Sequence, residues 1–115
     1  MAQPPIQNLD TVDIVGRRKD GGVDLFIVAS GPLDPSPQTQ QLLLTKVRNY
    51  LEQINTPAFQ AEFQHPPAEK VRIVVSCEQD VHPVIEMLIE RCKPWVAQNN
   101  ARIELEPRQL GTDGP

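Results

Sequence analysis

The hydrophobic positions of the chain follow two periods, one of two residues and one of about 3.6 residues. Strict alternation is typical of a strand whose side chains face opposite sides of a sheet, and helical spacing is typical of an amphipathic helix. The predicted strands are residues 10–18, 23–30, 71–77 and 101–106, and the predicted helices are residues 37–54 and 83–99. The order of elements is therefore ββαβαβ.

Local signals mark where several of these elements begin and end. The run Lys19-Asp20-Gly21-Gly22 is typical of a tight turn, so the first two strands form a hairpin. Gly31-Pro32 ends the second strand. Ser36 followed by Pro37 is typical of a helix start. A serine side chain can accept a hydrogen bond from a free backbone N–H of the first turn, and the N–H that proline lacks has no partner within the helix at that position.

The segment 55–69 is the least regular part of the chain. Phe59 and Phe63 are four residues apart, which predicts one short helical turn that closes over the core. Prolines at 57, 66 and 67 prevent a longer element there.

The order of elements predicts an α+β (α/β) two-layer sandwich. Strand–helix–strand crossovers are right-handed, so two successive crossovers in one direction place both helices on one face of the sheet. A chain of 115 residues makes one domain and is too short to cover the second face with further helices. We expect a mixed four-stranded sheet in the order 1-2-3-4 with an antiparallel first strand. The expected domain spans residues 10–107, between flexible tails at 1–9 and 108–115.

The helix-free face is the first candidate site. The alternation predicts that four apolar side chains on adjacent strands meet there, and these candidate interface residues are Val15, Phe26, Val28 and Val74. Exposed apolar patches often mark partner surfaces, and symmetric dimers are the commonest assemblies. We therefore expect self-association through this face. The alternative is that Phe59 and Phe63, or a terminal tail, cover the patch within the chain.

The second candidate site is the edge where the parallel strands end and the helices begin, which is the usual ligand site of α/β sheets. The candidate ligand-binding residues at this edge are Ser30, Asp34, Ser36, Glu78 and His82. The alternative is that these side chains only cap helices and close turns.

Candidates for metal binding and catalysis are weak. Cys77 and Cys92 fall on predicted core positions without C-x-x-C spacing, which favours buried thiols. His65 and His82 show no zinc-ligand spacing, and the chain has neither a phosphate-binding loop nor a G-x-S-x-G elbow. We predict no metal, no cofactor and no catalytic residue.

Charge and hydropathy exclude further classes. The chain has 15 acidic and 11 basic residues and a net charge of −4, which disfavours nucleic acid as a partner. No apolar run approaches the roughly 20 residues of a membrane span, and the N-terminal residues lack the charged and apolar regions of a signal peptide. We therefore expect a cytoplasmic protein with reduced cysteines and no membrane partner.

The pattern VDIVG…GGVDLFIVASGPLD…TQQLLLTKVRNYL, within residues 10–54, resembles an uncharacterised family of small bacterial proteins, a domain of unknown function. The features that carry the resemblance are the hairpin, Leu33-Asp34 after the second strand, and a leucine-rich helix ending in Tyr50-Leu51. The resemblance implies a bacterial, cytosolic origin and no particular activity.

These observations favour a non-enzymatic protein-interaction module that forms a homodimer through the open sheet face or binds another protein there. A small-ligand-binding protein or enzyme, with its site at the strand-end edge, is the first alternative. An antitoxin or immunity-like partner protein is the second, because the acidity and the size fit that class.

Overall fold

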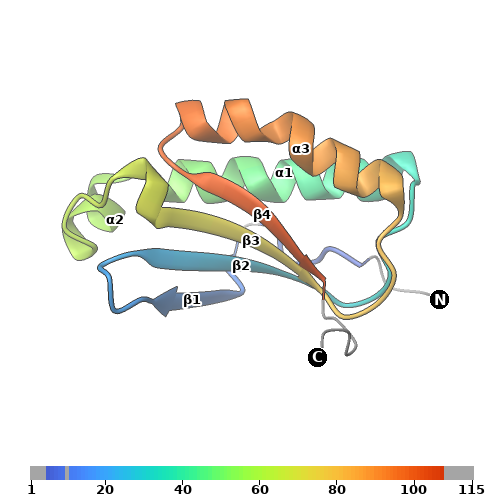
Figure 1. The fold of residues 1–115 in the computed structure, drawn as a ribbon, viewed down its shortest axis with the longest axis horizontal. Helices are drawn as coiled ribbons and strands as arrows, with labels where there is room; N and C mark the ends of the chain where they lie inside the picture. Colours follow the sequence, from blue (N-terminus) through green and yellow to red (C-terminus); the bar gives the residue numbers. More distant parts are fainter. Residues whose placement is uncertain (1–4, 10, 108–115) are drawn as a thin grey trace.

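The protein is built in two layers, a sheet and a pair of long helices (Figure 1). The computed structural model describes residues 5–9 and 11–107. In chain order the elements are β1 (Ile14–Arg17), β2 (Val23–Ala29), α1 (Pro37–Ile54), α2 (Pro57–Glu62), the short 3-10 helix η1 (Ala68–Lys70), β3 (Val71–Cys77), α3 (Pro83–Gln98) and β4 (Arg102–Pro107). The predicted ββαβαβ order is confirmed, with α2 and η1 inserted before β3.

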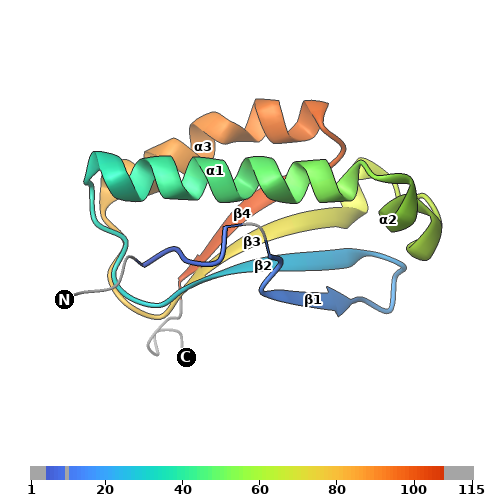
Figure 2. The same ribbon diagram turned by 180° about the vertical axis from the view of Figure 1, so that it is seen from behind.

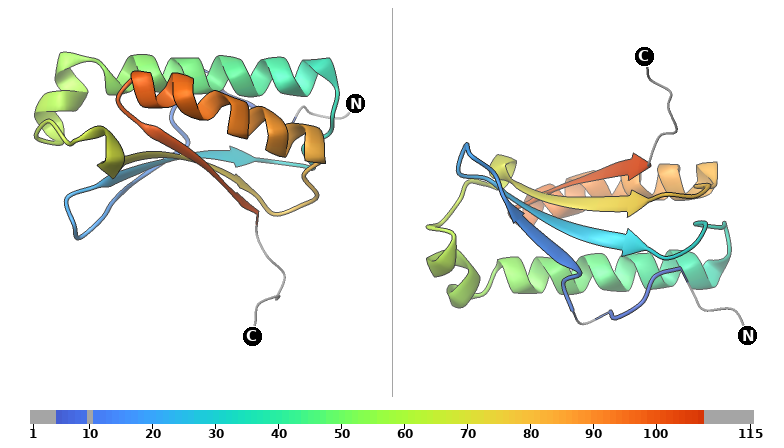
Figure 3. Two further views of the ribbon diagram at one scale, coloured as in Figure 1. Left: turned by 45° about the horizontal axis from the view of Figure 1, so that its top comes forward. Right: turned by 90° about the horizontal axis from the view of Figure 1, so that it is seen from below.

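Within the described residues, four strands form one mixed sheet in the order β1-β2-β3-β4. β1 runs antiparallel to β2, and β2, β3 and β4 are parallel. α1 and α3 lie over the same face of this sheet, and no described helix covers the other face (Figures 2 and 3). The predicted two-layer sandwich with both long helices on one face is therefore confirmed.

The core lies between the sheet and the helices. Alternate strand residues face the helices and are almost fully buried, among them Leu25, Ile27, Ile73, Val75 and Ile103. The side chains that α1 buries recur at three- and four-residue spacing, which turns one stripe of the helix toward the sheet.

The helix starts follow the predicted local chemistry. The Ser36 side chain accepts a hydrogen bond from the Thr39 N–H at 3.2 Å, and Pro37 occupies the first turn of α1. The prediction of one short helical turn over the core is also confirmed. α2 buries Phe59 in the core, and the Phe63 ring lies 4.5 Å from it, centroid to centroid.

The first strand is shorter than predicted, because side chains replace backbone pairing before Ile14. The Asp13 carboxylate accepts a hydrogen bond from the Val28 N–H at 2.9 Å. The Tyr50 hydroxyl donates to the Phe26 carbonyl at 2.7 Å and accepts from the Asp13 N–H at 2.9 Å. These groups satisfy the edge of β2, so β1 begins only at Ile14. The predicted strand over 10–18 is therefore wrong for residues 11–13 and one residue too long at its other end, and residue 10 lies outside the described residues.

The predicted N-terminal tail is wrong for residues 5–9, which pack against the domain. Ile6 is only 1% exposed and belongs to the core. The Lys46 ammonium donates to the Gln7 carbonyl at 2.6 Å, and the Asn49 amide donates to the Leu9 carbonyl at 2.9 Å. α1 therefore holds this segment by its backbone. Residues 1–4, the rest of that predicted tail, and the predicted C-terminal tail at 108–115 lie outside the described residues.

Lys46 is a fully buried lysine on the sheet side of α1. Besides the Gln7 carbonyl, its ammonium binds the Asp13 carboxylate at 2.7 Å, and it lies 5.8 Å from the centre of the Tyr50 ring. A buried ammonium is tolerated only when acceptors replace its hydration, and both acceptors here come from the segment before β1. The pair thus joins α1 to the start of the sheet.

We expect Lys46→Met to lower the free energy of unfolding by about 3 kcal/mol, because it leaves a largely buried carboxylate without its ammonium. Urea unfolding monitored by circular dichroism measures the loss. Lys93→Met is the matched control on α3, where the lysine side chain is 48% exposed, and it should change stability by less than about 0.5 kcal/mol. Equal stabilities for the two variants would contradict a structural role for the buried pair.

Candidate functional sites on the sheet face and at the strand-end edge

The helix-free face of the sheet is organised in rows set by the strand register. Its members are Ile14 and Gly16 of β1, Asp24, Phe26 and Val28 of β2, Arg72, Val74 and Ser76 of β3, and Arg102, Glu104 and Glu106 of β4. One row is charged from Asp24 to Arg102, and the next is apolar from Ile14 to Val74.

The register corrects one predicted interface residue. Ile14 pairs with Phe26, and Val15 pairs with Leu25, whose side chain faces the helices. Val15 therefore lies on the helix side of the sheet, and Ile14 takes its place on the open face. A shift of one residue exchanges the two faces of a strand, and the alternation of the sequence alone does not say which set faces the core.

The exposed apolar part of this face lies where β1 meets β2. Ile14 is 54% and Val28 is 41% exposed, and Phe26 lies between them, partly buried. The Phe26 ring extends alongside Gly16, with one ring carbon 3.9 Å from where a Cβ would stand. We call Ile14, Phe26 and Val28 the apolar corner.

Val74 lies on the predicted face but does not contribute exposed surface. It is only 1% exposed. Its row neighbours are Phe26 and Glu104, and Arg72 precedes it on the same face of β3. These larger side chains flank the valine on three sides, so the exposed patch is smaller than the sequence predicts.

Beside the apolar corner, five charged residues form a continuous series of ion pairs across the sheet. Asp24 pairs with Arg18 of the hairpin and receives two hydrogen bonds from Arg72, at 3.0 and 2.9 Å. Arg72 also binds Glu104 at 2.7 Å, and Glu104 binds Arg102 at 2.7 Å. We call Arg18, Asp24, Arg72, Glu104 and Arg102 the charge ladder.

The centre of the charge ladder is nearly buried. Asp24 is only 8% exposed. Hydrogen bonds from the Arg72 guanidinium hold the pKa of the Asp24 carboxyl below its ordinary value of 3.8, against the opposing effect of burial. The same contact raises the pKa of Arg72, so both groups stay charged in the folded protein.

We expect Asp24→Asn to lower the free energy of unfolding by about 2 kcal/mol at neutral pH. Because the folded pKa is depressed, the stabilisation is complete above the unfolded value near 3.8 and is lost as pH falls through the folded pKa. Urea unfolding at neutral pH and well below pH 3.8 should therefore show the wild type losing its advantage over the variant. A constant difference across this range would contradict the assignment to the Asp24 carboxylate.

At the strand-end edge, the two loops that precede the long helices are joined to each other. The Leu33 N–H donates to the Asp80 carbonyl, and the His82 N–H donates to the Leu33 carbonyl, both at 2.9 Å. Leu33 and Val81 thus form a parallel bridge beyond the ends of β2 and β3. The loops carry Asp34 and Ser36 on one side and His82 on the other.

Asp34 and Ser36 are brought together, and their contacts are those of a helix cap. One Asp34 carboxylate oxygen accepts from the Ser36 N–H at 3.0 Å, from the Ser36 hydroxyl at 2.6 Å and from the Thr39 hydroxyl at 2.7 Å. These bonds lower the pKa of Asp34, with the Ser36 hydroxyl as the largest cause. Thr39 is a member of this cluster that the sequence reasoning missed, because the recognised signal three residues after the cap is Glu or Gln and not threonine.

His82 and Ser30 also have structural contacts. The His82 ring nitrogen Nδ1 accepts from the Val84 N–H at 3.1 Å, which makes His82 the N-cap of α3. The Ser30 N–H donates to the Pro5 carbonyl at 2.8 Å and so anchors the N-terminal segment. Glu78 is exposed on the loop after β3. Capping and tethering therefore account for most of the candidate ligand residues.

The cysteines are free and buried, as the core pattern predicts. Burial raises the pKa of the Cys92 thiol, which disfavours the reactive thiolate. Cys77 Sγ lies 3.4 Å from the Gln79 carbonyl oxygen and 3.5 Å from that of Gly31. No group of three potential metal ligands among His, Cys, Asp and Glu is present in the part of the chain that the structure describes.

The chain matches no protein-family model, no curated protein and no solved structure. The resemblance to a bacterial family of unknown function therefore stays a prediction. None of the helices in the described residues combines the length and the apolar character needed to cross a membrane.

Proposed function

We propose that this protein is a non-enzymatic interaction module that forms a homodimer through the helix-free face of its sheet. The observation that carries the proposal is the apolar corner, where Ile14 and Val28 are about half exposed on a face that no described helix covers. Phe59, which sequence reasoning offered as an internal cover, belongs instead to the core cluster. Exposed apolar side chains gathered on one face are a common feature of partner surfaces.

The charge ladder supports the same surface. Its carboxylates and guanidinium groups already pair within the chain, at 2.7 to 3.0 Å where Arg72 meets Asp24 and Glu104. Burying a charge without a counter-ion in an interface is costly. Charges that are already ion-paired within the chain can contact a partner without leaving an unpaired charge in the interface. Apart from Glu106, the charged residues of the face therefore need no new counter-ion when the apolar corner meets a partner.

The size of the face predicts a weak and reversible dimer. Strands lie about 4.8 Å apart and rise about 3.3 Å per residue, so a face of four strands, each about six residues long, measures roughly 400 Å². Two copies would cover roughly 800 Å² in all, which is below the roughly 1,200–2,000 Å² of stable interfaces and in the range of weak, transient contacts. We expect association that depends on concentration over the micromolar range.

We place the protein in the cytoplasm of a bacterium. Two free thiols fit a reducing compartment, and the bacterial origin rests on the family resemblance alone. A small-ligand site or active site at the strand-end edge has less support, because Asp34 and His82 are occupied as caps. No contact in the described residues favours an antitoxin or immunity-like role over the homodimer.

The test is the solution mass of the wild type and of Val28→Lys, measured by light scattering over a wide concentration range. We expect a wild-type dimer at the higher concentrations and a monomer throughout for the variant, because a buried lysine at the contact would have no partner. A wild type that stays monomeric at every concentration would overturn the proposal.

Val15→Lys is the matched control. Val15 is also about half exposed, but it lies on the opposite face of the neighbouring strand. The control should dimerise like the wild type. Loss of the dimer in both variants would indicate pairing through the edge of β1 and would contradict contact through the open face.

A further inference from the structure

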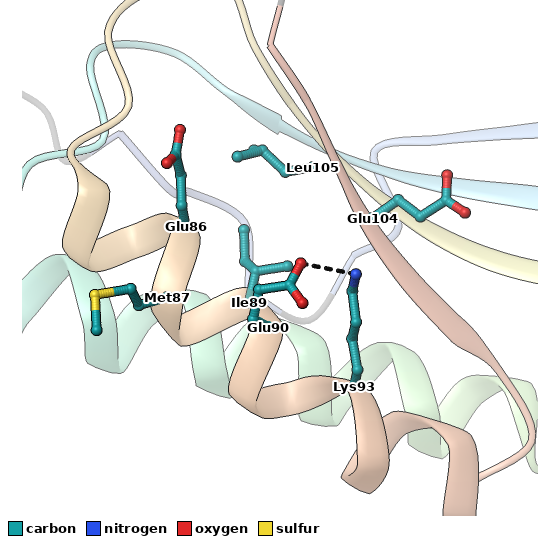
Figure 4. Close-up of a pocket in the computed structure, with 7 residues that line it drawn as sticks. All are labelled: Glu86, Met87, Ile89, Glu90, Lys93, Glu104 and Leu105. Atoms are coloured by element: carbon teal, nitrogen blue, oxygen red, sulfur yellow. Dashed lines mark ion pairs between the residues drawn. The ribbon is translucent and has the colours of Figure 1, made fainter.

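A groove runs between α3 and β4, at the side of the molecule opposite β1 (Figure 4). Its volume is about 630 Å³. Glu86, Ile89, Glu90 and Lys93 line it from the helix, and Leu105 lines it from the strand. Neither candidate site predicted from the sequence includes these residues.

One wall of the groove is a sheet edge. β4 is the last strand in the order β1-β2-β3-β4, and no described strand pairs with its outer side. The backbone N–H and C=O groups on the outer side of such a strand can accept a further strand. β4 has six residues, two more than the opposite edge strand β1, so it offers the longer template.

The floor of the groove is apolar. Ile89 is only 2% exposed beneath it. Leu105 is partly buried against the core and points toward α3 in Figure 4. An apolar side chain from an added strand would meet these two residues and exclude water from them.

The rim along α3 carries an excess of negative charge. Glu90 pairs with Lys93 at 2.7 Å, and Glu86 has no ion-pair partner among the described residues. Glu104, also at this groove, is neutralised by Arg72 and Arg102 on the other face of β4. The unpaired carboxylate favours a lysine or arginine on the occupant.

The spacing of the rim suits an extended chain. Glu86 and Glu90 are separated by four residues of helix, which is about 6 Å along the axis. Alternate side chains of a strand are about 6.6 Å apart on the same face. One helix turn of α3 therefore matches successive groove-facing positions of a strand laid beside it.

We propose that the α3–β4 groove binds an extended segment of another protein, which pairs with β4 as a fifth strand. The segment places an apolar side chain over Leu105 and Ile89, and a lysine or arginine beside Glu86. The groove shares Glu104 with the open sheet face, but pairing along the outer edge of β4 does not require the homodimer, so the two proposals are tested separately.

The test uses the full chain and a fluorescein-labelled peptide. Every second residue of the peptide is threonine, and the residues between the threonines are one valine and two lysines. We expect saturable binding by fluorescence anisotropy and backbone amide shifts at residues 102–106 in ¹⁵N NMR spectra. A peptide with glutamate in place of both lysines should bind at least roughly fivefold more weakly, in keeping with a few exposed ion pairs. A peptide N-methylated along one edge should not bind, because it cannot pair with β4.

Glu86→Lys separates the groove from non-specific attraction. It should weaken binding of the lysine peptide roughly fivefold and strengthen that of the glutamate peptide. Glu52→Lys, on the exposed side of α1, introduces the same charge and should leave both affinities close to the wild type. Undetectable binding of the lysine peptide, equal binding of the N-methylated peptide, amide shifts outside β4 and α3, or equal effects of the two substitutions would each overturn the proposal.

Discussion

The contact between Lys46 and Asp13 is the constraint that sets which side chains the open sheet face exposes. The buried ammonium holds the Asp13 carboxylate at 2.7 Å, and the other oxygen of that carboxylate accepts the N–H of Val28. Together with the Tyr50 hydroxyl, this pair occupies the edge of β2 and determines where β1 begins. The register that follows places Ile14 beside Phe26. The identity of the exposed apolar side chains is therefore set by a polar contact inside the molecule.

Most of the architecture follows from patterns that are local in the sequence. Capping chemistry at Ser36, the glycine turn before β2 and the spacing of apolar positions predict the elements, and the handedness of crossovers predicts their layering. Where prediction fails, a long-range contact decides the outcome. Ile6 enters the core because α1 binds the carbonyls of its neighbours, and Lys46 is buried because Asp13 lies opposite, 33 residues away. No periodicity in one segment contains that information.

The candidate sites were predictable to different extents for the same reason. The helix-free face could be predicted as a face, but the exchange of Val15 for Ile14 depended on a register that only the tertiary structure supplies. The loops with Asp34 and His82 do lie at the strand-end edge, but the same polar residues that suggest a ligand site there are efficient caps. The α3–β4 groove could not be predicted from the sequence, because its lining residues come from a helix and a strand that are brought together only in the folded structure.

The bridge between Leu33 and Val81 ties together the two loops that precede the long helices. In open α/β sheets, ligands bind in the crevice outside the carboxyl ends of the strands, between loops such as these. Here the two loops are hydrogen-bonded to each other, and α3 starts at a residue held by that bridge. The helix that walls the groove is thereby anchored at its first turn. Because this helix is already held in place, it would lose little conformational freedom if a segment bound in the groove. More of the favourable free energy of the contacts would then remain as affinity.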